Sequence, residues 1–161
     1  MTAPIKILFV DDEQLILSAL RRSLRREGFE LYFTVDPNAA ARLVGEHQID
    51  IVVSDYMMPE QSGVEVLALI GRLHQNTVRI MMTGQADREA TIRAINEGNI
   101  HRFIEKPWDD AELKRILHEV GRTIQVKRAS APRDLDQRAH RTLVRDGSGA
   151  IVIKHAAPER A

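Results

Sequence analysis

Residues 5–13 read Ile-Lys-Ile-Leu-Phe-Val-Asp-Asp-Glu, an apolar run that ends abruptly in three acidic residues. Ile5–Val10 is short, branched and, apart from Lys6, apolar, which is typical of a strand buried on both faces of a parallel sheet. Apolar positions then recur at helical spacing: Leu15, Ile16, Ala19, Leu20, Ser23 and Leu24. Arginines occupy the opposite side of this predicted helix, and Gly28 is placed to end it.

The same strand–helix unit recurs four more times along the chain. The further predicted strands are Leu31–Val35, Ile49–Ser54, Val78–Met82 and Arg102–Glu105. The further predicted helices are one opened by Asp36-Pro37, then Val64–Leu73, Asp87–Asn96 and Asp109–Val126. Strict alternation with right-handed crossovers predicts an α/β fold, a doubly wound five-stranded parallel sheet covered on both faces. Ligands of such sheets bind beyond the carboxyl ends of the strands.

Charged or hydroxyl side chains follow four of the predicted strands at that edge: Asp11 and Asp12, Asp55, Thr83, and Lys106. Three carboxylates brought together repel one another unless a cation lies among them. The oxygen ligands favour Mg²⁺, and a chain without cysteine offers little to a softer metal. A carboxylate can attack phosphorus and form an acyl phosphate, with the lysine and the hydroxyl neutralising its oxygens. The pattern therefore predicts Mg²⁺-dependent phosphoryl chemistry.

Five motifs at these positions resemble the receiver domain of two-component response regulators. They are Phe9–Glu13, Ser54–Pro59, Ser62-Gly63, Met82–Gly84 and Lys106-Pro107. They occur in the order typical of that family, and the resemblance covers about Ile5 to Val126. It implies a receiver domain at residues 1–126 with the flavodoxin-like strand order 2-1-3-4-5.

The resemblance also implies how the chain would bind a metal and a phosphoryl group. Asp55 would be the phosphoacceptor and would take the group from a sensor histidine kinase or a phosphotransfer protein. Asp12 and Asp55 would bind Mg²⁺ directly together with the backbone carbonyl of Met57, and Asp11 would act through water. Lys106 would pair first with Asp55 and then with the phosphoryl group.

A conformational switch is implied as well. Thr83 would turn toward the phosphoryl group and Phe103 would be the switch aromatic, while the Lys106–Pro107 peptide bond would be cis. Phosphorylation adds about −1.5 to −2 charges and would bias a surface formed by the fourth helix, the fifth strand and the fifth helix. A downstream protein partner is expected on this surface, with a homodimer as an alternative.

Three sequence features give the expected receiver an individual character. The segment Ala94–Trp108, with its Lys-Pro-Trp ending, resembles receivers joined to cyclic-di-GMP phosphodiesterase domains or found in hydrogenase-type regulators. Trp108 is then either an anchor for a partner or a packed cap on the last helix. Met57 and Gln85 flank the expected path of a hydrolytic water, and neither side chain is charged, which predicts a long-lived phosphoryl group. The residues that determine kinase specificity are expected near Leu15–Leu20.

The same strand ends also fit a second class of function. A Mg²⁺ phosphatase with an aspartate nucleophile needs an acid/base carboxylate two residues after Asp55, where this chain has Met57. We therefore expect a phosphoacceptor switch rather than an enzyme.

The formal net charge of zero hides an acidic body and a basic tail. Residues 1–120 carry 14 basic and 19 acidic side chains, whereas residues 121–161 carry 9 and 4. The sequence predicts a linker at Lys127–Asp134 and permits a short helix through Leu135, Ala139 and Leu143. It then indicates a turn at Asp146–Gly149 and a strand at Ala150–Ile153. These segments hold too few apolar residues for an independent core, so residues 127–161 are expected to be a basic extension and not a domain.

Three roles remain open for this extension: a solvated tail, a docking segment for a partner or for the receiver's own switch surface, and a nucleic-acid-binding segment. The last would use Arg133, Arg138, Arg141 and Arg145, and a nucleic-acid-binding regulator is the alternative function. We favour the solvated tail, followed by the docking segment, and expect nucleic-acid binding least because no aromatic residue follows Trp108 to stack on a base.

The remaining expectations concern location. The longest apolar stretches fall far short of the ~20 residues that span a bilayer. Met1–Pro4 shows no secretory signal, so we expect a cytoplasmic protein with no membrane contact.

Overall fold

Five parallel strands form one sheet in the order β2-β1-β3-β4-β5. The strands are β1 (Lys6–Val10), β2 (Glu30–Thr34), β3 (Ile51–Asp55), β4 (Val78–Thr83) and β5 (Arg102–Glu105). The predicted fold class and strand order are confirmed, and the predicted strand bounds agree within two residues. This computed structural model describes residues 2–97, 99–131, 141–145 and 151–155. The chain divides into two units, Met1–Gln125 and Val126–Ala161.

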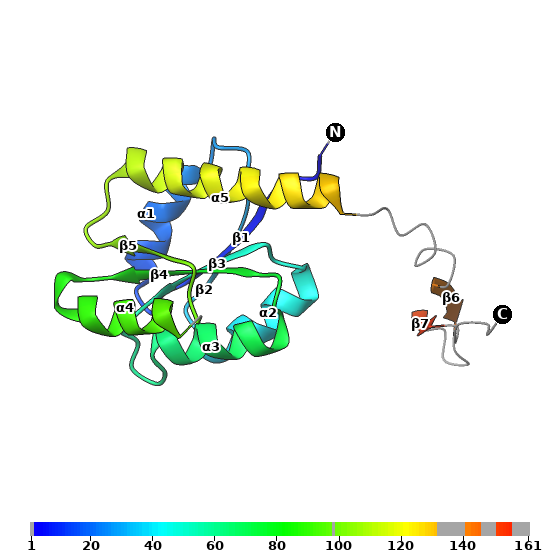
Figure 1. Ribbon diagram of the computed structural model, residues 1–161, viewed down its shortest axis with the longest axis horizontal. Coiled ribbons are helices and arrows are strands. Elements are labelled where there is room, and N and C mark those ends of the chain that lie inside the picture. The colour runs from blue at the N-terminus through cyan, green and yellow to red at the C-terminus, as the bar shows by residue number, and fades with distance from the viewer. Residues whose placement is uncertain (1, 98, 132–140, 146–150, 156–161) are drawn as a thin grey trace. The chain divides into compact units, whose positions relative to one another are not determined.

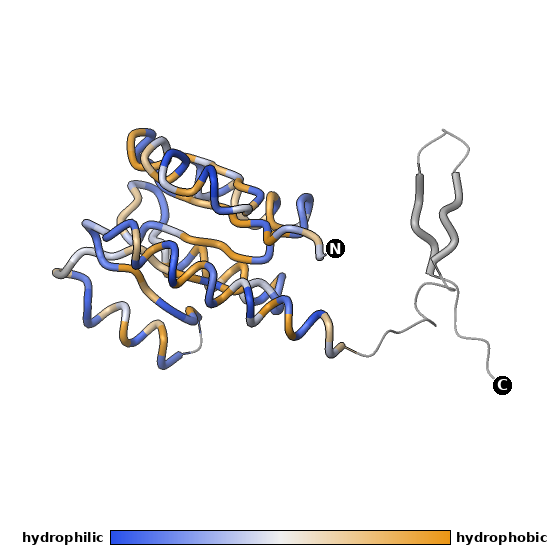
Figure 2. The backbone as a smooth tube through the Cα atoms, turned by 90° about the horizontal axis from the view of Figure 1, so that it is seen from above, coloured by the Kyte–Doolittle hydropathy of each residue, from blue (hydrophilic) through white to orange (hydrophobic). Residues whose placement is uncertain are grey.

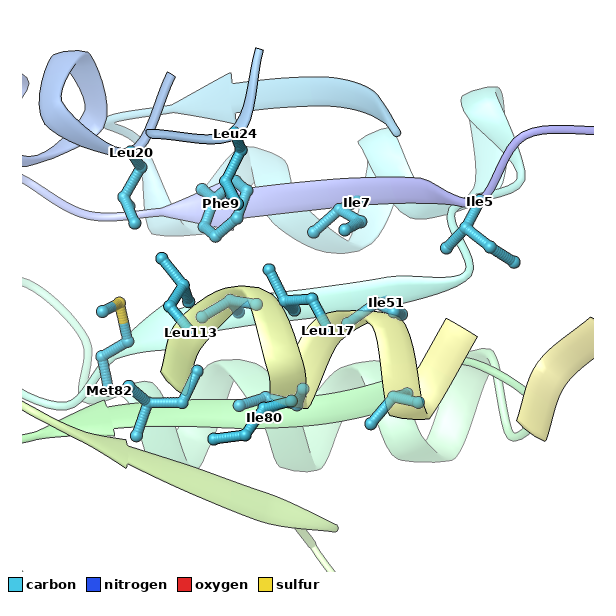
Figure 3. Close-up of a cluster of buried hydrophobic side chains, with 14 of the residues drawn as sticks. Ile5, Ile7, Phe9, Leu20, Leu24, Ile51, Ile80, Met82, Leu113 and Leu117 are labelled. Atoms are coloured by element: carbon cyan, nitrogen blue, oxygen red, sulfur yellow. The ribbon is translucent and has the colours of Figure 1, made fainter. Parts of the chain in front are cut away.

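Helices cover both faces of the sheet (Figure 1). α1 (Gln14–Leu24) and α5 (Asp110–Ser130) lie on one face, and α2 (Ala40–His47), α3 (Gly63–Leu73) and α4 (Arg88–Asn96) lie on the other. Two short 3-10 turns, η1 (Pro37–Ala39) and η2 (Gln85–Asp87), lead into α2 and α4. A buried apolar cluster fills each interlayer space. In the α1–α5 cluster, Leu20, Leu113 and Leu117 point toward Phe9 and Ile80 of the sheet (Figure 3).

Apolar residues concentrate along the strands of the sheet, while the helices alternate between apolar and polar residues (Figure 2). Every residue of β3 is buried, as are four of the five residues of β1. The continuous apolar runs in the sequence arise because each central strand contacts helices on both of its faces.

Local sequence signals fix where the elements begin. The Asp36 carboxylate accepts a hydrogen bond from the Asn38 backbone N–H at 2.9 Å, and Pro37 opens η1 as the sequence predicts. Ser62 and Glu65 form a reciprocal capping box at the start of α3. Gly28 has a φ of +82°, which glycine adopts without steric cost, in the turn after α1.

Two predictions about the helices are wrong in detail. Leu15 is 83% exposed, whereas the neighbouring Leu17 is 2% exposed and packs in the core with Leu20 and Leu24. Because residues 15–17 are all apolar, the sequence does not determine which of them faces the core. Packing of the helix against the sheet buries Leu17 and leaves Leu15 exposed. Residues 127–130 of the expected linker are also helical, since α5 continues to Ser130, and residues 132–134 lie outside the described residues.

The second unit contains an antiparallel pair, β6 (Arg141–Arg145) and β7 (Ile151–His155), in which Leu143 pairs with Ile153. The predicted strand near Ala150–Ile153 is confirmed. The permitted helix is wrong at Leu143, because backbone pairing with β7 holds this residue in a strand. Leu135, Ala139 and the predicted turn Asp146–Gly149 lie outside the described residues, as do Arg133 and Arg138.

Within the described part of the chain, no helix is both long and apolar enough to cross a membrane.

Candidate functional site

Backbone hydrogen bonds that continue just past the sheet join the carboxyl ends of neighbouring strands, β1 with β2, β3 with β4 and β5 with β4. The Asp11 N–H donates to Thr34 O at 3.2 Å, the Tyr56 N–H to Met82 O at 2.9 Å, and the Lys106 N–H to Thr83 O at 2.8 Å. These bonds hold the loop residues that follow β1, β3 and β5 in register with their neighbours. The predicted site residues therefore meet at one edge because the backbone fixes where each strand ends.

Lys106 bridges two of the predicted carboxylates. Its Nζ lies 2.9 Å from Asp55 Oδ1 and 3.1 Å from Asp11 Oδ2, and both aspartates are buried. Burial raises the pKa of Asp55 above its usual value, and the charges of Asp11 and Asp12 act in the same direction against the pull of Lys106. Burial opposes the charged form of Lys106, but its contacts with Asp55 and Asp11 outweigh this effect and raise the pKa of Lys106.

Asp11, Asp12 and Asp55 offer oxygen atoms that all lie within 4.8 Å of one another, a group that could hold a metal ion. Both carboxylate oxygens of Asp11 already have partners, since Oδ1 accepts from the Glu13 N–H at 2.9 Å and Oδ2 from Lys106. Asp12 is exposed. An all-oxygen set with three carboxylates and one ammonium group carries excess negative charge, so these residues fit a hard divalent cation such as Mg²⁺.

Gly63 allows the loop after β3 to close tightly against the backbone of Asp55. A Cβ at residue 63 would lie 2.2 Å from the backbone oxygen of Asp55. The Gly63 N–H also donates to Tyr56 O at 2.9 Å. The Ser62-Gly63 motif is therefore explained by a close approach of two backbone segments that any other residue would prevent.

Thr83 ends β4 with a side chain that is almost fully buried. Its hydroxyl donates to Gly84 O at 3.1 Å and accepts from the Thr91 hydroxyl at 3.3 Å. Thr91 lies on α4 and was not among the site residues predicted from the sequence. Its only sequence signal is a hydroxyl at a position of α4 that faces the core.

The other predicted residues surround this centre. Phe103 is half-buried and lines a pocket of about 590 Å³ together with residues of α4 and α5. Met57 lies in the loop after β3 and is 66% exposed. The Lys106–Pro107 peptide bond is cis.

Trp108 packs against the α1–α5 core, and its indole N–H donates to Asp110 Oδ1 at 3.0 Å. This packing favours the cap on the last helix over a free anchor. The same ring nevertheless lines a pocket of about 710 Å³ with Ile16, Arg22 and Lys106.

The model of the response regulator receiver domain matches residues 7–118, and the chain belongs to this family. The signal receiver domain of an HD domain-containing protein from Pseudomonas fluorescens Pf-5 is 34% identical with a TM-score of 0.74, covering 81% of this chain and 96% of that one. Response regulators of this family are phosphoacceptor signalling proteins.

Two curated relatives are longer than this chain. The hydrogenase transcriptional regulatory protein HoxA of Bradyrhizobium diazoefficiens is 31% identical over 133 residues, which are 83% of this chain and 27% of HoxA. The transcriptional regulatory protein CpxR of Escherichia coli K12 is 32% identical over 108 residues, which are 67% of this chain and 45% of CpxR. The chain thus spans less than half the length of either relative.

Proposed function

We propose that this chain accepts a phosphoryl group on Asp55 and uses it to switch a protein-interaction surface. The observation that carries the proposal is the Lys106 ammonium group, which contacts both Asp55 and Asp11 beside the exposed Asp12. A buried carboxylate with a raised pKa, a fixed cation and spare oxygen ligands is suited to accept a group that itself brings negative charge.

In the proposed transfer, an oxygen of Asp55 attacks the phosphorus of a phosphohistidine on a sensor histidine kinase or phosphotransfer protein. The new O–P bond forms an acyl phosphate as the P–N bond breaks, and the imidazole leaves with its electron pair and takes up a proton. The Lys106 ammonium group then exchanges its contact with the Asp55 carboxylate for one with the phosphoryl oxygens. A bound Mg²⁺, held by Asp12, Asp55 and the Met57 carbonyl with Asp11 acting through water, would neutralise those oxygens.

The kinase or phosphotransfer protein would dock beside this site. The pocket lined by Ile16, Arg22 and Trp108 opens between α1 and the loop after β5, and Lys106 forms part of its wall. Leu15, at the start of α1, is 83% exposed. The exposed Leu15, and a pocket that shares Lys106 with Asp55, support a partner that covers α1 during the transfer.

The proposed output runs through Thr83 and Phe103 to the surface formed by α4, β5 and α5. The pocket beside Phe103 leaves room for the ring to change its position when the Thr83 side chain moves. The proposed downstream partner is a protein that binds this surface.

The test is labelling of the full chain by a small phosphodonor such as acetyl phosphate in the presence of Mg²⁺. We expect one phosphoryl group per chain by intact mass, and no labelling of Asp55→Asn or after chelation of Mg²⁺. Asp50→Asn is the matched control, because Asp50 is a buried aspartate at the opposite end of β3. Labelling that persists in Asp55→Asn, or that is lost from a folded Asp50→Asn, would contradict the proposal.

A further inference from the structure

The hydroxyl groups of Thr83 and Thr91 form a buried pair between β4 and α4. Thr83 is 2% exposed and Thr91 is 0% exposed, and their oxygens lie 3.3 Å apart. The Thr91 hydroxyl also lies 3.0 Å from Asp87 O, one turn earlier. The single proton of Thr91 therefore has two acceptors, the side chain of Thr83 and a backbone carbonyl.

Thr83 is held by this pair in one orientation. Its proton is directed to Gly84 O at 3.1 Å, while its oxygen shares the Thr91 proton with Asp87 O. A phosphoryl oxygen on Asp55 is an acceptor, so Thr83 must redirect its proton before it can bind that group. The contact with Thr91 opposes this rotation because it fixes the position of the Thr83 oxygen.

We propose that Thr91 is a positioning residue that stabilises the unphosphorylated orientation of Thr83 and thereby sets how readily the domain switches. The inference rests on the proposed function, in which Thr83 binds the phosphoryl group. When Thr83 rotates away, the Thr91 proton still has Asp87 O, so no buried hydroxyl loses all of its partners. Because Asp87 O can accept the Thr91 proton, the contact between Thr91 and Thr83 can break and form again, as switching between two states requires.

The test measures binding of beryllofluoride, a stand-in for the phosphoryl group, to the full chain at saturating Mg²⁺ by isothermal titration calorimetry. Thr91→Val removes the hydroxyl but keeps the shape of the side chain. We expect its affinity for beryllofluoride to rise about two- to tenfold, the range that corresponds to one net hydrogen bond. Thr91→Ala removes the hydroxyl and the methyl group together, and is expected to shift the affinity for beryllofluoride in the same direction.

Two controls separate this role from a merely structural one. Thr91→Ser keeps the hydroxyl, and its affinity is expected to stay within about twofold of the wild type. Thr77→Val removes a comparable buried hydroxyl, which donates to Ile49 O at 3.2 Å at the opposite end of the sheet, and should leave the affinity unchanged. Mg²⁺ affinity measured alone should be the same in all these variants.

The possible failures are distinguishable. Unchanged or weaker beryllofluoride binding by Thr91→Val and Thr91→Ala would overturn the role of Thr91 and leave the proposed function standing. A wild-type chain that binds no beryllofluoride with Mg²⁺ would overturn the proposed function and this inference with it.

Discussion

The two ends of the sheet both bury polar side chains, but they bind them in different ways. At the amino end, Asp50 accepts from the Lys6 N–H at 2.9 Å, and Arg79 donates to the backbone oxygens of Asn99 and Thr77. At the carboxyl end, the Lys106 side chain binds the side chains of both Asp11 and Asp55. These amino-end bonds join side chains to a fixed backbone, whereas the bonds of Lys106 join side chains that can exchange partners.

This difference shows why chemistry is expected at one end only. A side chain bonded to a backbone amide or carbonyl fixes the position of a strand or loop, and its removal leaves a buried group unsatisfied. Three carboxylates around one ammonium group instead leave negative charge that a cation can neutralise. The same residue type, a buried aspartate, is therefore structural at position 50 and suited to chemistry at position 55.

The largest predicted effect comes from Gly63→Ala. The added Cβ would lie 2.2 Å from the Asp55 backbone oxygen, and backbone at that position cannot move without displacing the end of β3. We expect a loss of stability above the ~1–3 kcal/mol typical of overpacking, together with loss of phosphorylation. Urea unfolding and labelling by a phosphodonor measure the two effects.

Gly84→Ala is the matched control for this prediction. A Cβ at residue 84 would lie 4.0 Å from Asp87 Oδ2, its nearest neighbour among the described residues. The backbone φ of Gly84 is −78°, which alanine adopts readily. Equal losses in the two variants would refute the argument from close approach at Gly63.

Asp50→Ala is predicted to affect stability alone. The substitution leaves the Lys6 N–H without its side-chain acceptor, which is expected to lower the free energy of unfolding by about 1–3 kcal/mol. Phosphorylation should proceed at the wild-type rate in the folded protein. Asp50→Asn keeps an oxygen acceptor, so its free energy of unfolding should fall less. A labelling defect in either folded variant would contradict the contrast between the two ends of the sheet.

Asp55→Asn is predicted to have the opposite effect, a small gain in stability with loss of phosphorylation. Because the folded state raises the pKa of Asp55, the ionised carboxylate destabilises the fold at neutral pH, and asparagine removes that charge. Thermal unfolding with a chelator should show a higher melting temperature for the variant at pH 8. The difference should narrow as the pH falls and the wild-type carboxylate takes up a proton, and a lower melting temperature at pH 8 would contradict the prediction.

The sequence predicted the sheet and the position of the site well because both depend on strand ends. Apolar runs locate the strands, and parallel strands bring their carboxyl ends to one edge, so Asp11, Asp55, Thr83 and Lys106 could be placed together without side-chain detail. The resemblance predicted the pairing of Lys106 with Asp55, but the second bridge from Lys106 to Asp11 could not be predicted, since it depends on which way a long side chain turns.

Features that depend on the packing of whole elements were less predictable. Leu15 and Leu17 are equally apolar, and only contact with the sheet decides which of them is buried. Leu143 fits a helical spacing but pairs with Ile153, a partner ten residues away that periodicity alone does not reveal. The Thr83–Thr91 contact spans eight residues and depends on η2, the turn that brings α4 back over the end of β4.

The backbone bonds at Tyr56 and Lys106 have a consequence for how such a protein can evolve. They hold the strand ends in place without help from the side chain of Met57, which is 66% exposed in the adjoining loop. A substitution at residue 57 therefore costs the fold little, and we expect it to alter access of water to an acyl phosphate on Asp55. Natural selection can then change the lifetime of the acyl phosphate through one surface residue, without changing the residues that accept the phosphoryl group.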